Sequence, residues 1–210
     1  MSVTTGRRPG RPPGTNAADT RKRIINAARG VFSEVGYDAA TFEEIAVRAG
    51  LTRPAINHYF HNKRILFREV VAETHGTVME TSAELARQQD SLLAQIGLFM
   101  ALVIQADPDR TAARFMVTAV LESRRRPDLL EPEQDMVALT RDFITETVGD
   151  AIDRGELDAA TDVKGLADMM LAVLWGMGLY AGFVGTPEEL LGAGEQLRRL
   201  LMGQLWNLAS

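Results

Sequence analysis

An all-α fold is predicted by three features of this sequence. Apolar residues recur at helical spacing through most of the chain. Sustained alternation of β-branched residues, with hairpin dipeptides between the runs, is missing. Helix-breaking residues separate the apolar stripes at Asp107-Pro108, Pro127, Gly155, and Gly185 to Pro187. These breaks divide the chain into about nine helices, and its 210 residues suffice for two domains.

Residues 1–17 form a basic arm that we expect to be disordered when free. The stretch GRRPGRPPGTN is too rich in Gly, Pro and Arg to bury apolar surface. Two roles stay open for Arg7, Arg8 and Arg11. The GRP tripeptide around Arg11 resembles the centre of an AT-hook, which inserts arginine into a minor groove. The alternative is a solubilising tail with loose attraction to phosphate. No apolar run follows the arginines, so we expect no targeting peptide.

The first helix is expected to begin near residue 19 and to end at Gly36. Asp19 or Thr20 can cap its N-terminus, and Gly36 suits the position just after a helix, where a positive φ is common. One side of this helix is expected to be buried, through the apolar stripe Ile24, Ala28, Val31, Phe32 and Val35.

Residues 41–60 predict two short helices joined by a tight turn. Thr41 and Glu44 have the spacing of a capping box, Gly50 stands where the chain needs a positive φ, and Thr52 can cap the second helix, with Pro54 in its first turn. The inward positions are Phe42, Ile45, Ala46, Ala49, Leu51, Ile56 and Phe60. With the first helix, these segments make a homeodomain-like helix-turn-helix domain over residues 18–64.

The second short helix has one polar face, with Arg53, Asn57, His58 and His61 directed outward. A helix of about eight residues is about 12 Å long and fits into a major groove. Arginine can bind guanine with two hydrogen bonds, and asparagine can bind adenine in the same way. The face therefore predicts reading of DNA bases.

Four elements follow one another in a fixed order: VFSEVGYDAAT, FEEIAVRAGLT, a helix ending in YF, and HNKRILFREVV. Through them, residues 20–71 closely resemble the DNA-binding domain of the TetR family of bacterial transcriptional regulators. The resemblance implies base contacts by Arg53, Pro54 and Asn57. It implies phosphate contacts by Thr41, His58, Tyr59 and Lys63, and we add the capping residue Thr52 to the DNA contacts. Many family members have tyrosine where Asn57 stands, so we expect a different operator.

General chemistry leaves simpler roles open for some of these residues. Pro54 can serve only as a helix starter, Tyr59 can belong partly to the core, and His61 can be solvated. His58 and His61 have a spacing that suits a metal on a helix, but His75 is the remaining histidine and the chain has no cysteine. We therefore predict no metal site and no cofactor.

The charge of the chain is unevenly distributed. The net charge of −5 argues against a nucleic-acid partner when it is taken alone. Residues 1–75 hold 12 Lys and Arg against 7 Asp and Glu, a net +5, whereas residues 76–210 hold 11 against 21, a net −10. A basic end on an acidic body suits DNA binding through that end.

Residues 65–210 are expected to form a second, helical domain, with helices near 63–88, 91–106, 109–124, 132–154, 162–184 and 187–208. The fifth of these is apolar on every side, apart from Asp168 near its start. Its uncharged run, residues 169–184, has 16 residues, fewer than the roughly 20 that a bilayer requires. We therefore expect no membrane partner, and burial between subunits instead. The string GMGLYA matches a dinucleotide fingerprint but lies inside a helix with no strand before it, so we reject that function.

Two roles are predicted for the second domain. The last two helices are expected to close a four-helix bundle between two copies of the chain, through Leu174, Gly178, Leu197, Leu201 and Leu205. The family resemblance implies the same dimer, and also a ligand cavity in this domain. Core packing is the alternative for each candidate lining residue, namely Phe99, Met100, Phe115, Met116, Met170 and Trp175. Few charges fall at inward positions, so we expect an apolar or amphipathic ligand such as a fatty acyl chain, a steroid-like molecule or a hydrophobic drug.

The sequence thus predicts a ligand-responsive, homodimeric transcriptional regulator. We expect a repressor that leaves a palindromic operator when a small hydrophobic molecule binds. An activator and a ligand-independent architectural DNA-binding protein remain as alternatives. We do not expect an enzyme, because the chain has no DDxxD-like carboxylate run and suggests no Ser-His-Asp or Cys-His arrangement. The lack of cysteine and of a signal or membrane segment suits the cytoplasm.

Overall fold

The computed structural model describes residues 17–205, and the predictions for Arg7, Arg8 and Arg11 lie outside these residues. The described part of the chain is helical and has no strand, which confirms the all-α fold. Its N-terminal helices are α1 (Ala17–Ala39), α2 (Phe42–Ala49), α3 (Arg53–Tyr59) and α4 (Lys63–Thr74). We call α1 to α3 the head and the helices from α4 onward the body.

The body continues from α4 through a π-helical segment, η1 (His75–Glu80), into α5 (Thr81–Ala86). It goes on with α6 (Leu92–Ala106), α7 (Thr111–Arg125), the short 3₁₀ segment η2 (Pro132–Gln134), α8 (Met136–Asp153), α9 (Val163–Leu179), the π-helical segment η3 (Tyr180–Val184) and α10 (Pro187–Leu201). Since α4, η1 and α5 join without a break, the described residues form nine helices. The predicted elements are therefore present, with ends that differ by at most four residues, except that α10 ends at Leu201 and not near residue 208.

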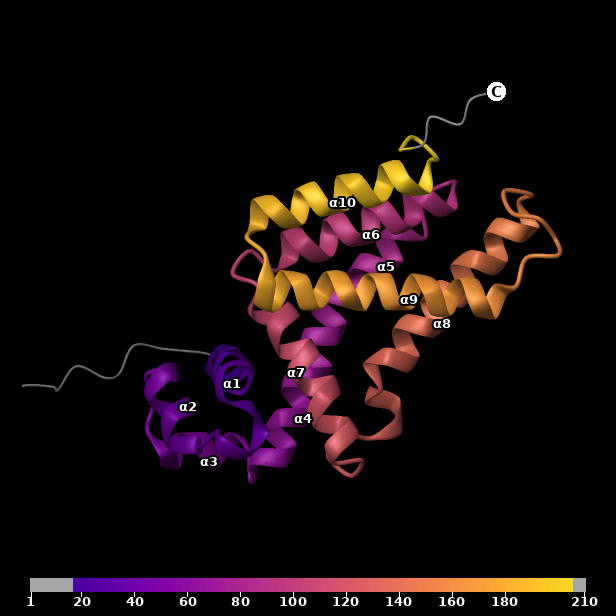
Figure 1. Ribbon diagram of the computed structural model, residues 1–210. Helices are drawn as coiled ribbons and strands as arrows, with labels where there is room; N and C mark the ends of the chain where they lie inside the picture. Colours follow the sequence, from indigo (N-terminus) through magenta and orange to yellow (C-terminus); the bar gives the residue numbers. More distant parts are fainter. Residues whose placement is uncertain (1–16, 206–210) are drawn as a thin grey trace, which may run out of the picture.

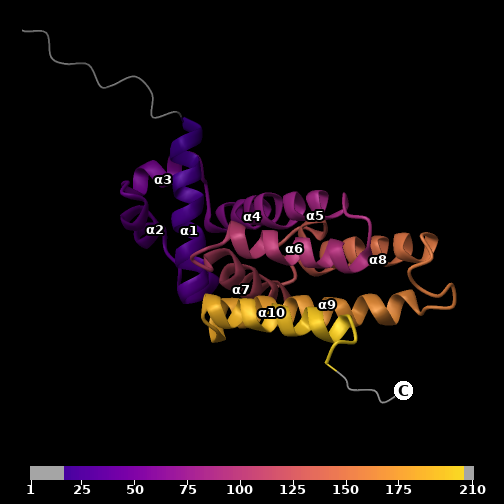
Figure 2. The ribbon, with the colours of Figure 1, turned by 90° about the horizontal axis from the view of Figure 1, so that it is seen from above.

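The head lies at one end of the molecule and the body extends away from it (Figure 1). Helix α7 packs on α1 and α4, and so joins the two parts. Within the body, α8 packs on α9, and α10 lies beside α6 and η3. Figure 2 shows α9 and α10 along one edge of the body. At Gly182 in η3, an added Cβ would come within 3.0 Å of the Arg114 backbone, so this glycine permits a close approach to α7.

The joint between head and body is an aromatic cluster. The ring of Phe32 on α1 lies 5.0 Å from that of Phe67 on α4, and Phe67 lies 5.5 Å from Phe115 on α7. All three side chains are fully buried. Edge-to-face contacts of this kind add about 0.5–1.5 kcal/mol per pair to the burial itself. The prediction that Phe115 lines a ligand cavity is therefore wrong in placement, because this ring fills the joint.

Helix α1 departs from its prediction at both ends. It is already helical at Ala17, so Asp19 and Thr20 lie inside its first turns and not at a cap. Gly36 has the predicted positive φ, at 78°, and breaks the helix there, although helical residues continue to Ala39. Val35 was predicted to be buried but is 45% exposed, because the stripe that faces the core ends with Phe32 and Ser33.

Helices α2 and α3 form as their sequence predicts. Thr41 caps α2 and makes both bonds of the capping box with Glu44, and Gly50 ends the helix with φ 62° and ψ 38°. Thr52 caps α3, and Asn62 caps α4 through the amide of Ile65. Ile56 and Phe60 are buried, as are Ile45, Ala46 and Ala49. Local signals within a few residues therefore fix the angle between α2 and α3.

Replacing Gly50 with alanine is expected to lower the free energy of unfolding by about 1–2 kcal/mol, because an L-residue in the left-handed region places its Cβ close to a carbonyl oxygen. Gly97→Ala is the matched control. Gly97 lies exposed in α6, and an added Cβ there meets no atom within 4 Å. That change should raise stability by about 0.5–1 kcal/mol. Chemical denaturation measures the free energy of unfolding of both variants. A change of the same sign in the two variants would contradict the role of Gly50.

Among residues 17–205, one helical segment, Val163–Val184, is long and apolar enough to cross a membrane by length and composition, with a mean hydropathy of 1.5, and 28% of its most apolar stretch is buried. Helices α6 and α7 pass the same test only as a pair bent by 105°. Core helices of soluble proteins also satisfy this criterion. The apolar surface that α9 leaves exposed is therefore described below with the rest of the body.

Candidate nucleic-acid interface and cavity

Helix α3 presents a polar face on a fixed support. Arg53, Pro54, Asn57 and His58 are exposed, and Tyr59 is half-buried. The opposite side of the helix is anchored by Ile56 and by Phe60, which caps its C-terminus and donates its backbone N–H to Ile56 O. The short helix cannot turn about its own axis without exposing these apolar side chains. The structure thus brings the predicted base-reading residues Arg53, Pro54 and Asn57 to one surface.

Arginines elsewhere in the head and its border are engaged by acidic or carbonyl groups. Arg21 pairs with Glu69 at 2.7 Å, Arg48 pairs with Glu34 at 2.6 Å, and Arg23 donates to Ala49 O. Arg53 has no such partner within residues 17–205. Its guanidinium therefore keeps its donors available for a ligand such as a base edge.

The two threonines predicted to meet DNA differ in what their hydroxyls can offer. Thr41 Oγ1 accepts from the Glu44 amide at 3.2 Å and donates to Glu44 Oε2 at 2.9 Å, so its single proton is already used. Thr52 Oγ1 accepts from the Ala55 amide at 3.4 Å, and its proton stays available. A phosphate needs a donor, so Thr52 can bind one directly, whereas Thr41 must first release Glu44.

Lys63 is directed toward the protein. Its ammonium donates to Asp38 O at 2.9 Å and to Ala40 O at 2.8 Å, and it lies 4.7 Å from the centre of the Tyr37 ring. Burial lowers the pKa of Lys63 from its ordinary value. In this structure Lys63 ties the N-terminus of α4 to the connection between α1 and α2, and its contact with phosphate stays a prediction.

The C-terminal end of α7 reaches the same corner of the head. Arg126 forms an ion pair with Asp38, and its guanidinium lies 5.4 Å from the centre of the Tyr37 ring. The hydrogen bond from Arg126 holds the pKa of Asp38 below its usual value. Glu122, which is buried, accepts from the Tyr37 amide at 3.4 Å. The sequence does not predict this link, because groups almost ninety residues apart carry no local signal of their contact.

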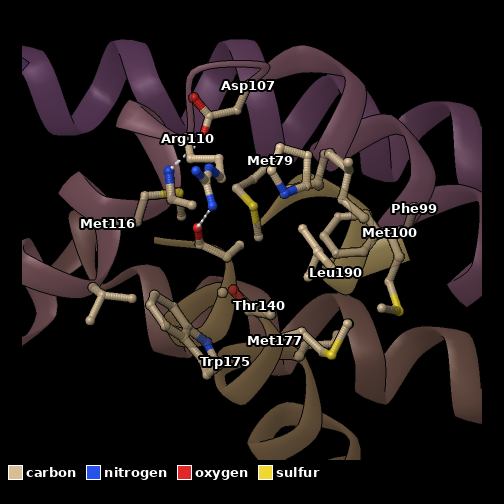
Figure 3. Close-up of a pocket in the computed structure, with 18 of the residues that line it drawn as sticks. Met79, Phe99, Met100, Asp107, Arg110, Met116, Thr140, Trp175, Met177 and Leu190 are labelled. Carbon is tan, nitrogen blue, oxygen red and sulfur yellow. Dashed lines mark hydrogen bonds between the residues drawn. The ribbon is translucent and has the colours of Figure 1, made fainter. Parts of the chain in front are cut away.

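A cavity of about 150 Å³ lies within the body, bordered by α6, α7, α9 and α10 (Figure 3). Its wall is mostly apolar and includes four of the six predicted lining residues, namely Phe99, Met100, Met116 and Trp175. Met170 does not line it, because this side chain packs into the core between α8 and α9. Phe115, in the aromatic joint, does not line it either.

The polar groups of the cavity wall gather near the connection between α6 and α7. The Asp107 carboxylate accepts from the Ala112 and Ala113 amides at 2.9 and 2.7 Å, and burial raises the pKa of Asp107 despite these bonds. Arg110 has a left-handed backbone, with φ 59°, and donates to the carbonyls of Ala181 and Gly185. The cavity wall thus connects the start of α7 to the end of η3.

Helix α9 and the η3 segment that continues it expose an apolar stripe on the side away from the cavity, which we call the stripe of α9. Its members are Met169, Ala172, Gly176, Leu179 and Phe183, spaced by three and four residues. Of the predicted dimer contacts, Leu201 and Leu205 are exposed and Leu197 is half-buried. Leu174 and Gly178 instead line the cavity. They lie on the side of α9 opposite the exposed stripe, and their contact with a second copy stays a prediction.

Comparison with known proteins extends over both parts of the chain. A family model described as bacterial regulatory proteins, tetR family, matches residues 24–70. The chain is 30% identical to the HTH-type transcriptional regulator TtgR of Pseudomonas putida over 178 residues, which cover 77% of this chain and 79% of that relative. It is 21% identical to the HTH-type transcriptional regulator UidR of Escherichia coli, with coverages of 78% and 82%. The solved structure of the fatty acid degradation regulator FadR from Bacillus halodurans has a similar fold, with a TM-score of 0.73 at 18% identity over 95% of this chain and 99% of that one.

Proposed function

This chain belongs to the TetR family of bacterial transcriptional regulators, and on that premise we propose that it is a homodimeric repressor, released from a palindromic operator by a small hydrophobic effector. Members of this family bind DNA and generally respond to ligands, and the relatives of this chain are regulators rather than enzymes. The operator, the effector and the repressor role are our proposals for this chain. A DNA partner places its action in the bacterial cytoplasm.

The observation that supports DNA recognition most strongly is the presentation of α3. Arg53 and Asn57 are exposed on a helix whose inner side is anchored by Ile56 and Phe60. Capping hydrogen bonds fix both the start of this helix and the start of α4 after it. A prearranged helix loses little conformational entropy when it enters the groove. Arg53 is suited to guanine and Asn57 to adenine.

The exposed stripe of α9 supports a dimer. Met169, Leu179 and Phe183 are large apolar residues that face outward together with the small residues Ala172 and Gly176. The same stripe on a second copy, related by a two-fold axis, can cover it in a self-complementary contact. Small residues at the centre let two such helices approach closely. Two copies of α3 would then face successive major grooves, about 34 Å apart along the DNA.

Selection of bound duplexes from a random library tests this proposal. We expect an inverted repeat whose half-sites lie about one helical turn apart or slightly more. We also expect a stoichiometry of two chains per duplex in sedimentation experiments. Recovery of a single unrepeated site, or of no preferred sequence, would contradict the dimeric operator.

The cavity supports the effector role because α7 connects it with the head. Ala113 and Met116, in the first half of α7, line the cavity, whereas Glu122 and Arg126, at its end, contact Tyr37 and Asp38 in the head. A molecule that binds only one position of α7 shifts the balance between head arrangements by its preference for that position. Shifting the ratio of the DNA-binding arrangement to the released arrangement from 99:1 to 1:99 requires that the ligand prefer the released arrangement by about 5.5 kcal/mol.

Filling the cavity tests the effector role. Gly178 lies on the cavity wall, and an added Cβ there meets no atom within 4 Å. Gly178→Leu should therefore place its side chain in the cavity and weaken the binding of toluene, a probe of suitable size, by about tenfold or more. Affinity for the selected duplex should stay within about twofold.

Gly149→Leu is the matched control for this variant. Gly149 also lies in a helix with open space around its Cβ position, but on α8 and away from the cavity wall. It should leave toluene binding unchanged. Isothermal titration calorimetry measures the probe, and fluorescence anisotropy measures the duplex. Equal toluene affinity in both variants would exclude this cavity as the site.

A further inference from the structure

One residue of the cavity wall has a buried polar atom that lacks a partner. The indole nitrogen of Trp175 is buried, yet it makes no hydrogen bond within residues 17–205. A buried donor without an acceptor costs on the order of 1–3 kcal/mol, so native proteins rarely retain one. A ligand that brings an acceptor to this atom would recover that cost.

The other polar side chains of the cavity are already engaged. Thr140 Oγ1 donates to Met136 O at 2.7 Å. The Asp107 carboxylate holds two backbone amides of α7, and Arg110 donates to two carbonyls at the end of η3. In Figure 3 the indole of Trp175 stands on one side of the hollow, with Phe99 and Met100 on the other. Trp175 therefore offers the donor that a bound molecule can use without breaking a bond inside the protein.

The charged groups of the wall do not favour an anionic ligand. Asp107 and Arg110 both lie on the wall, so their charges offset one another, and the Arg110 guanidinium already donates to the Ala181 and Gly185 carbonyls. A single neutral N–H also compensates a carboxylate poorly for the loss of its hydration. A ketone, ester or lactone oxygen has no such penalty and accepts one hydrogen bond readily.

The size of the cavity limits the ligand as well. An apolar cavity of about 150 Å³ that is partly open holds a molecule of roughly the size of benzene. In this conformation a steroid nucleus is too large to be enclosed, and a long acyl chain could place only its end inside. The enclosed part of the ligand is therefore a small ring or a short chain.

Building on the proposed function, we propose that the effector is a neutral, largely apolar molecule whose carbonyl oxygen accepts a hydrogen bond from Trp175 Nε1. A movement of Trp175 on ligand binding can affect other parts of the protein. Its ring packs both against the core that contains the aromatic joint and against the core between α8 and α9. A shift of this ring therefore acts on both cores at once.

Three probes with the same number of non-hydrogen atoms test the proposal. Acetophenone has a carbonyl, cumene has a similar size without an acceptor, and benzoate is an anion. The chain has two tryptophans, and Trp206 lies outside the described residues, so Trp206→Phe leaves one indole N–H signal in the NMR spectrum. Acetophenone should move this proton downfield, as expected when the proton gains an acceptor. Cumene should bind without that shift, and benzoate should bind at least tenfold more weakly than acetophenone.

An isosteric replacement isolates the hydrogen bond from the shape of the ring. In the Trp206→Phe background, biosynthetic incorporation of 3-benzothienylalanine replaces Trp175 by a ring of similar size that has no N–H. Acetophenone affinity, measured by calorimetry, should fall about five- to tenfold, which corresponds to one neutral hydrogen bond. Cumene affinity should change less than twofold. Equal losses for both probes would indicate shape alone and would overturn the proposal.

The remaining outcomes are also decisive. Failure of both acetophenone and cumene to bind would overturn the proposal, because the cavity would then not accept apolar molecules of its own size. Benzoate that binds more tightly than acetophenone would assign recognition to Arg110 in place of Trp175. These measurements use no DNA. A carbonyl probe that binds through Trp175 but leaves duplex affinity unchanged would contradict the repressor mechanism and not this inference.

Discussion

Replacing Arg53 and Asn57 together with alanine is expected to weaken binding to the selected duplex by about 2–6 kcal/mol, since each lost bidentate base contact costs about 1–3 kcal/mol. Both side chains are exposed, so the fold should be unaffected. Discrimination between matched and mismatched bases should fall at the two positions that these residues read. The slope of affinity against salt should change little, because phosphate contacts remain.

The control for this variant is the pair Arg87→Ala and Gln88→Ala. These residues are exposed at the end of α5, in the body, and removing them changes the net charge by the same amount. Duplex affinity should stay within about 0.5 kcal/mol of the original, because Arg87 lies in the body, where it forms an exposed ion pair with Glu146 and lies over the Phe143 ring. Fluorescence anisotropy at several salt concentrations measures both pairs. An equal loss in the two would indicate a nonspecific effect of charge, and no loss in the first would remove α3 as the reading helix.

Placing two carboxylates on the exposed stripe of α9, through Leu179→Glu and Phe183→Glu, is expected to convert a dimer into monomers. Leu179 and Phe183 are 48% and 51% exposed, so the isolated chain should tolerate the change. In a dimer the carboxylate at position 179 would be buried without a partner, at a cost of about 3–5 kcal/mol. The one at position 183 would lie near the Arg114 guanidinium, which is 5.9 Å from the centre of the Phe183 ring. A monomer contacts one half-site, and its affinity for the full operator should fall at least about a hundredfold.

Sedimentation equilibrium measures the association, with Leu85→Glu and Leu93→Glu as the matched control. These leucines are also exposed, but they lie on α5 and α6 and not on the stripe. The control variant should sediment like the original chain. A Leu179→Glu and Phe183→Glu variant that stays dimeric would show that a different surface joins the two copies.

The head illustrates how much of the fold local sequence can specify. Thr41 with Glu44, Gly50 and Thr52 act on groups within a few residues, so their capping bonds and the left-handed turn could be predicted before any tertiary contact was known. The burial of Ile56 and Phe60 follows from helical periodicity alone, because the rest of α3 is polar or small.

The candidate site was predictable to the same extent. The exposed face of α3 follows from that periodicity, and so does the exposure of Arg53 and Asn57. The direction of the Lys63 side chain does not follow from periodicity. Its hydrogen bonds to Asp38 O and Ala40 O depend on how α4 packs beside the connection between α1 and α2. Long, flexible side chains take their direction from such neighbours and not from their own spacing.

The sequence by itself determined the all-helical class, the turn between α2 and α3 and the polar face of α3, because each depends on signals within one or two helical turns. Tertiary structure alone decided which side of α9 lines the cavity. That helix is apolar on every side, so the spacing of its apolar residues does not show which side is buried. The sequence therefore could not distinguish the side of Leu174 and Gly178 from the side of Leu179 and Phe183. Packing against α7 and α8 decides which side of α9 faces inward. It also places Trp175 on the cavity wall and the apolar stripe on the opposite side of the helix.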